Sequence, residues 1–141
     1  MKYIAETIKR VIFAAILLAG VVSCTSEDDI DEIFIEREWT LTSVNEPGRT
    51  FYTENRLYSI LFADGAFTAT TPTGNTITGQ WKANGDTRSF ACMNVRTHGD
   101  ISKDTIALKM RDILTGAKSY SGTTLWLRIE RDKKTYMLFG N

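Results

Sequence analysis

The sequence has few of the residues that most often do chemistry or cross-link a fold. Its 141 residues include two cysteines, one histidine and two prolines, and the formal net charge is zero. One histidine and a free cysteine cannot supply the four ligands of a typical zinc site. There is no Gly-x-Ser-x-Gly elbow, no phosphate-binding loop and no basic patch interleaved with aromatics. We therefore expect no enzyme, no metal or other cofactor and no nucleic-acid partner.

No apolar run is long enough to cross a bilayer as a helix. The run from Val11 to Val22 has 12 residues, whereas a spanning helix needs about 20. Three basic residues, Lys2, Lys9 and Arg10, precede it. A positive start followed by a short apolar run is typical of a secretory signal peptide.

The apolar run ends in Val21-Val22-Ser23-Cys24, which resembles the lipobox of bacterial lipoproteins. The resemblance implies that residues 1–23 are a lipoprotein signal peptide and that Cys24 becomes the lipidated first residue. Several acyl chains on that residue would anchor the protein durably to a membrane. The alternative is an ordinary signal peptide that happens to contain a cysteine.

An acidic segment follows this cysteine. Residues 27–38 carry seven acids and one base, whereas residues 39–141 carry nine acids and 13 bases. Such a composition forms a solvated linker by default, and we expect a tether over residues 24–38. Ser26 followed by three acids resembles the signal that exports lipoproteins of some Gram-negative lineages to the cell surface. The segment indicates the bacterial outer membrane. The sequence does not distinguish its periplasmic face from its cell-surface face.

The remaining residues, 39–141, form one predicted domain of short runs in which apolar and polar side chains alternate. Alternation predicts strands near 38–44, 57–62, 66–71, 76–83, 89–95, 124–130 and 135–139. Asp64-Gly65 is a strong hairpin turn, and Gly79 within a strand marks a bulge, a bend or a close backbone approach. Phe51 to Arg56 is expected to be a loop, and Ser121-Gly122 a turn. We predict a mainly β (α+β) fold, with a small antiparallel curved sheet or barrel of about seven or eight strands.

Residues 104–115 fit two structures. Apolar residues alternate from Ile106 to Met110, as in a strand, but they also recur at helical spacing. Ser102 or Asp104 could cap a helix, and Gly116 stands where a helix often ends. We predict one late helix here.

Several motifs resemble those of the META/HslJ-like domain, a small β-rich domain common in bacterial lipoproteins. They are Trp39-Thr40-Leu41-Thr42-Ser43-Val44-Asn45, Gly74-Asn75-Thr76-Ile77-Thr78-Gly79-Gln80-Trp81, and Ser89-Phe90-Ala91-Cys92. The resemblance implies structural roles for Trp39, Asn75, Gly79, Trp81 and Cys92, no established catalysis, and an association with envelope stress. The paired cysteines common in that family are absent, so we expect Cys92 to be a small buried hydrophobe.

Cys92 and His98 are the only nucleophile–base pair that the sequence offers. His98 lies in the polar stretch Thr97-His98-Gly99-Asp100, and no third residue is placed to orient it. We interpret it as a solvated loop histidine.

Aromatic residues near the C-terminus are the best candidates for binding. Alternation predicts that Leu125, Leu127 and Ile129 point inward and that Trp126 points outward, with Tyr120 and Tyr136 nearby. Exposed aromatics often mark a binding face, although packing against the helix or a loop is the alternative.

The sequence is compatible with two functions. The first is a membrane-anchored envelope lipoprotein with a non-catalytic interaction or structural domain, whose partner is an unknown envelope protein. The alternative is a lipocalin-like carrier of a small apolar ligand, since a small barrel can enclose one and Glu38-Trp39 resembles the start of lipocalins.

Overall fold

The computed structural model describes residues 37–53 and 57–141. The predicted signal peptide, Cys24 and all but the last two residues of the predicted tether lie outside the described residues. Within the described ranges, no helix has both the length and the apolar character needed to cross a membrane.

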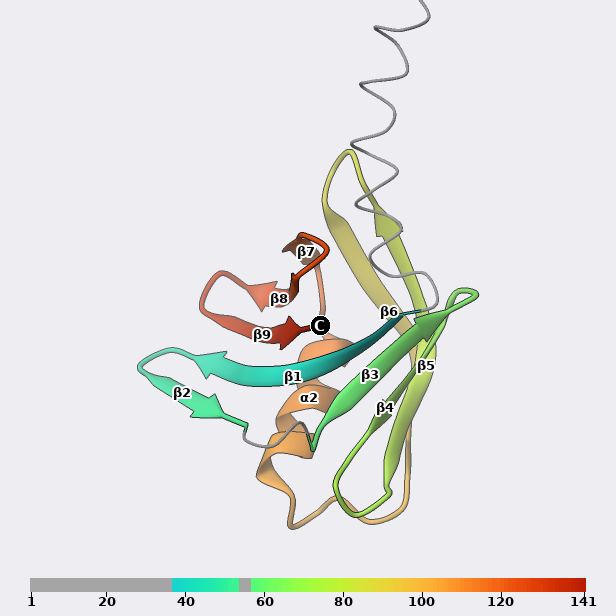
Figure 1. Ribbon diagram of the computed structural model, residues 1–141, viewed down its shortest axis with the longest axis vertical. Helices are drawn as coiled ribbons and strands as arrows, with labels where there is room; N and C mark the ends of the chain where they lie inside the picture. The colour runs from blue at the N-terminus through green and yellow to red at the C-terminus, as the bar shows by residue number, and fades with distance from the viewer. Residues whose placement is uncertain (1–36, 54–56) are drawn as a thin grey trace, which may run out of the picture.

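In residues 37–53 and 57–141, nine strands form one antiparallel sheet (Figure 1). They are β1 (Arg37–Glu46), β2 (Arg49–Tyr52), β3 (Ser59–Ala63), β4 (Ala66–Thr70), β5 (Thr76–Asn84), β6 (Ser89–His98), β7 (Ser119–Gly122), β8 (Trp126–Asp132) and β9 (Thr135–Gly140). Neighbours follow chain order from β3 to β9, and β1 pairs with β2, β3 and β9. The pairing of β1 with β9 closes the sheet on itself, and the prediction of a mainly β, antiparallel curved sheet is confirmed.

The hairpin turns use residues that accept a positive φ or bond to the turn backbone, and the predicted Asp64-Gly65 turn is among them. Asp64 and Gly65 have φ values of 50° and 75° between β3 and β4, which is the geometry of a tight turn that matches strand twist. Between β1 and β2, Gly48 takes a φ of 76° directly after Pro47. In the turn between β5 and β6, the side-chain oxygen of Asn84 accepts hydrogen bonds from the backbone N–H groups of Asp86 and Thr87.

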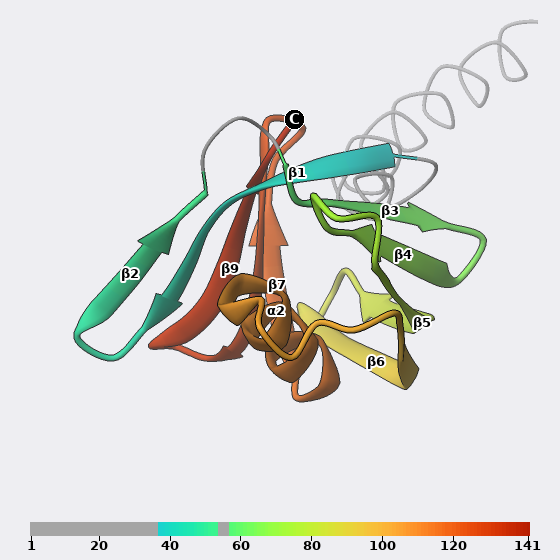
Figure 2. The ribbon, with the colours of Figure 1, turned by 90° about the horizontal axis from the view of Figure 1, so that it is seen from below.

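The predicted late helix is confirmed as α2 (Thr105–Thr115), the one helix in the described part of the chain. Of the two candidate caps, Asp104 is the one used: its carboxylate accepts a 3.0 Å hydrogen bond from the N–H of Ala107. The apolar face of the helix packs mainly on β6 and also against β8, β9 and β1. Figure 2 shows α2 across the end of the sheet that faces the viewer.

Aromatic side chains fill much of the interior. Phe62 lies edge-on to both Trp81 and Phe90, whose rings stack with centroids 6.3 Å apart. Trp39 is fully buried, and Trp81 is half-buried with its indole N–H donated to the carbonyl of Ala66. Such rings supply large apolar area together with geometric preference, so aromatic packing makes up much of the core.

Gly79 has the structural role that its position in a strand predicted. A bulge interrupts the pairing of β5 with β6 between Thr78 and Gln80. On the other side Gly79 pairs with Phe67, and a Cβ at Gly79 would lie 2.7 Å from the Phe67 ring. The glycine therefore lets an aromatic ring pack directly on the backbone.

Four local predictions were wrong. His98, expected in a loop, is the last residue of β6 and pairs with Thr76 of β5. Residues 51 and 52, expected in a loop, belong to β2, which pairs with β1 from Ser43 to Glu46. Ser121-Gly122, expected to be a turn, is the end of β7, which pairs with β8. Leu125 precedes β8 and is 72% exposed rather than inward-facing. For β2 and β7, pairing with the neighbouring hairpin strand outweighed local residue preference.

Candidate functional site

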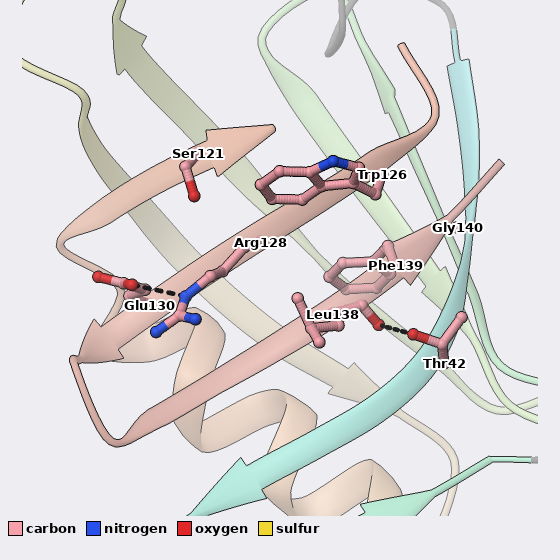
Figure 3. Close-up of a pocket in the computed structure, with 8 residues that line it drawn as sticks. All are labelled: Thr42, Ser121, Trp126, Arg128, Glu130, Leu138, Phe139 and Gly140. Carbon is pink, nitrogen blue, oxygen red and sulfur yellow. Dashed lines mark hydrogen bonds and ion pairs between the residues drawn. The ribbon is translucent and has the colours of Figure 1, made fainter. Parts of the chain in front are cut away.

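The outer face of β7, β8, β9 and β1 carries a groove of about 650 Å³ (Figure 3). Its lining residues come from all four strands: Thr42, Ser121, Trp126, Arg128, Glu130, Leu138, Phe139 and Gly140. Most of this lining is apolar, and its polar groups are few. A mostly apolar hollow of this size with a few placed polar groups is typical of small-molecule sites. We call it the Trp126 groove.

Strand register explains where the groove forms. Trp126 of β8 pairs with Gly140 of β9, and Gly140 pairs on its other side with Thr40 of β1. Because directly opposed residues share one face of a sheet, the missing side chain of Gly140 leaves a hollow beside the indole. Trp126 is 42% exposed, so the prediction that it faces outward is confirmed.

A charged pair lies at one end of the Trp126 groove. The Nε of Arg128 lies 2.6 Å from a carboxylate oxygen of Glu130, and both side chains are mostly buried. The N–H of Nε does not align as a hydrogen bond, so the contact is an ion pair. Glu130 also accepts a 2.9 Å hydrogen bond from Ser119, which fixes its carboxylate. The charge of Arg128 is thus balanced within the groove.

Tyr136 and Tyr120, predicted to lie beside Trp126, have different positions. Tyr136 is on the outer face of β9, two residues from Leu138, and its ring lies under the guanidinium of Arg128. Tyr120 is 2% exposed and packs edge-on to Phe90 in the core. The correction is that Tyr120 is not part of the outer face, because β7 is a strand that points it inward.

A second hollow, of about 490 Å³, lies beyond Tyr136, between the β1–β2 turn and the β8–β9 turn. Its cations are Arg49, Lys133 and Lys134, and its acid is Glu46, which forms an ion pair with Lys109. On its floor the amide of Asn45 donates to Ser43 and accepts from Thr50. We call this region the basic hollow. Sequence reasoning missed it because its cations are distant along the chain.

Cys92 and His98 do not form a nucleophile–base pair. Burial raises the pKa of the Cys92 thiol to about 12, and a thiol is nucleophilic only as the thiolate. Cys92 pairs with Trp81 across β5 and β6, whereas the exposed His98 ring lies 3.0 Å from the hydroxyl of Thr78. Among the described residues there is also no group of three or more histidine, cysteine or acidic side chains that could hold a metal ion.

Asn75 holds the start of β5 to the loop after β6. Its side-chain amide donates to the carbonyl of Asp100 at 2.9 Å and to the hydroxyl of Thr73 at 3.1 Å. Gly99, with a φ of 95°, leaves no room for a Cβ beside this amide. Like Trp39, Gly79 and Trp81, Asn75 lies away from the Trp126 groove and supports the fold through the contacts described.

Comparison with known proteins identifies the family. The family model for a domain of unknown function, DUF4847, matches residues 50–141. The chain belongs to the DUF4847 family. The crystal structure of a DUF4847 family protein from Bacteroides vulgatus has the same fold, with a TM-score of 0.60 and 21% identity over 78% of this chain and 95% of that one. No curated protein matches the chain.

Membership of the DUF4847 family shows that the predicted META/HslJ-like identity is wrong. The motifs behind that resemblance are a strand that starts with tryptophan and a glycine-containing hairpin. Both features are common in small, tightly curved antiparallel sheets, because aromatic side chains fill the core and glycines allow the strands to bend. The expected link to envelope stress depended on that resemblance and therefore has no remaining support.

Proposed function

We propose that this DUF4847 protein is a lipid-anchored lipoprotein of the outer membrane whose domain binds a ligand or partner in the Trp126 groove without catalysis. The observation that carries the proposal is the exposed indole of Trp126 beside the hollow left by Gly140. Tryptophan is among the residues that most often dominate binding energy at an interface. The anchoring half of the proposal is supported by the lipobox-like motif at Cys24.

The packed interior favours this site over a lipocalin-like one. Trp39, Phe62 and Phe90 lie inside the closed sheet, each at most 2% exposed. A ligand enclosed there would have to displace well-packed rings, and losing an aromatic from a core costs about 3–5 kcal/mol. Binding in the outer groove needs no such rearrangement.

Native mass spectrometry of the full chain, purified from its own host in mild detergent, tests the proposal. We expect bound mass on the wild type, its loss in Trp126→Ala, and its retention in Leu61→Ala. Leu61 is a matched control because it is 41% exposed on β3, away from the Trp126 groove.

A protein partner that dissociates during purification requires a second measurement. A photo-crosslinking amino acid at Thr42, in the groove, is compared in the host with one at Thr68, exposed on β4. The binding function is rejected if the wild type carries no extra mass and position 42 gives no product beyond those of position 68.

A further inference from the structure

The Trp126 groove and the basic hollow are adjacent parts of one surface. Gly140, Leu138 and Tyr136 alternate along the outer face of β9, and four residues of strand span about 13 Å. Arg128 joins the two parts, because its guanidinium covers the Tyr136 ring and donates to the carbonyl of Lys133 at 3.2 Å.

Charge is distributed unevenly along this surface. In the Trp126 groove the cation is Arg128, and Glu130 balances it. In the basic hollow, Arg49, Lys133 and Lys134 make no ion pair with any acid among the described residues, and Glu46 is paired with Lys109. An occupant with complementary charge would be apolar at the Trp126 end and negative at the other.

The strand pairing argues against an extended peptide. β9 is paired with β8 on one side and β1 on the other, and β8 is paired with β7 and β9. Neither β8 nor β9 has a free backbone edge within the groove, so a peptide could not add as a further strand beside the residues that form most of its lining. Side chains alone would have to recognise the occupant.

The charge distribution also argues against a polyanion. A nucleic acid or an acidic polysaccharide carries charge along its whole length and needs cations along its whole track. Here the unbalanced cations gather in the basic hollow, at the turns between strands.

We propose that the Trp126 groove and the basic hollow together bind a small amphipathic carboxylate, free in solution. Its apolar body lies along Trp126 and Leu138, and its carboxylate meets the cations of the basic hollow. Arginine and lysine form the strongest hydrogen bonds with carboxylates because both partners are charged. This inference rests on the proposed function, since it names the ligand class of the same groove.

Photo-labelling of the full chain in phosphatidylcholine nanodiscs tests the inference. The probe is a dodecanoic acid with a diazirine on its chain, and the matched probe is its methyl ester, which has the same chain without the charge. Cross-linked peptides are mapped by mass spectrometry. We expect the acid to label the peptides that contain Trp126 and Leu138 at concentrations where the ester does not.

Variants separate the two ends of the site. Lys133→Gln and Lys134→Gln should each weaken labelling by the acid by about fivefold, the effect of one solvated charge at contact. Gly140→Val should weaken labelling by the acid, and by the ester at the higher concentrations where it labels, because it fills the hollow beside Trp126. The matched controls are Lys82→Gln and Arg96→Gln, each of which removes one charge from an exposed position of β5 or β6 and should change nothing.

Each contrary outcome overturns a distinct claim. Equal labelling by acid and ester, unaffected by the lysine variants, would overturn the anionic ligand and leave the groove as an apolar site. A third probe is a phosphatidylcholine with a diazirine on its chain. If it labels the groove as strongly as the free acid does, the occupant is a lipid surface and not a free carboxylate. Absence of groove labelling by either probe overturns the amphiphile, while the crosslinking in the host still decides the proposed function.

Discussion

The guanidinium carbon of Arg128 lies 3.5 Å from the centroid of the Tyr136 ring, so a β8 cation covers the face of a β9 aromatic. The same side chain pairs with Glu130 and donates to the carbonyl of Lys133. A cation over an aromatic face is attracted by the negative charge of the ring face. Arg128 thus holds the β8–β9 hairpin together across the outer face that carries the Trp126 groove.

We predict that Arg128→Leu lowers the free energy of unfolding by about 1–2 kcal/mol, because a mostly buried cation–π contact and an ion pair are lost together. Urea denaturation measures the change. The matched control is Arg111→Leu, whose pair with Asp112 is largely exposed and is expected to contribute about 0–0.5 kcal/mol. Equal effects of the two substitutions would mean that Arg128 has no special structural role.

Gly79→Ala is predicted to destabilise the fold by about 1–3 kcal/mol, the usual cost of overpacking. The added methyl group would lie 2.7 Å from the Phe67 ring and 2.9 Å from the carbonyl oxygen of Met93. Gly140→Ala is the control, because its Cβ would meet only Thr42, at 3.4 Å. Thermal unfolding of both variants checks the difference, and a neutral Gly79→Ala would show that Phe67 moves aside freely.

Tyr58 should make stability depend on pH in the alkaline range. Burial, and secondly a 2.9 Å hydrogen bond to Asp104, raise the pKa of Tyr58 to about 12. The pKa of Tyr58 in the folded protein lies above its value in the unfolded chain. The contribution of Tyr58 to the free energy of unfolding is therefore fully present below about pH 10 and is lost as the pH rises through 12.

Comparison with Tyr58→Phe isolates this contribution. The difference in unfolding free energy between wild type and variant should be constant up to about pH 10 and then fall by about 1 kcal/mol, after allowance for solvent screening. Other groups that titrate there, including Cys92, cancel in the difference. A difference that stays flat to pH 12 would contradict the raised pKa.

The sequence predicted those parts of the fold that local chemistry decides. Alternation located β1, β3, β4 and β5, the Asp64-Gly65 turn followed from residue type, and Asp104 capped the helix as one of two candidates. These features depend on residues within a few positions of one another.

What the sequence could not predict depends on which residues of neighbouring strands lie opposite one another. β2 forms because it meets β1 from Ser43 to Glu46, and Tyr120 is buried because β7 pairs with β8. The Trp126 groove likewise requires Gly140 opposite Trp126. Periodicity gave the outward direction of Trp126 correctly but carried no information about which residue faces it.

Cys92 is predicted to resist alkylation in the folded protein. Burial raises its thiol pKa to about 12, so at pH 8 the thiolate fraction falls at least about a hundredfold below that of an unperturbed cysteine. Iodoacetamide labelling of the Cys92 peptide, measured by mass spectrometry with and without urea, should show at least that ratio. Similar rates in both conditions would mean that the thiol is accessible in the native state.

The two cysteines should differ completely as acceptors of lipid. A diacylglycerol thioether needs a sulfur that the modifying enzyme can reach, and the lipobox-like residues 21–24 place Cys24 just after the apolar run. We predict that the full chain, expressed in a Gram-negative host with an alkyne-bearing palmitate, takes up the label and sediments with the membranes. Cys24→Ser should lose both properties, because several acyl chains are what make anchoring durable. Cys92→Ser, the matched control, should keep both, since that sulfur is half-buried in the domain. Label retained in Cys24→Ser would contradict the lipid anchor and leave an ordinary signal peptide as the explanation of the N-terminal segment.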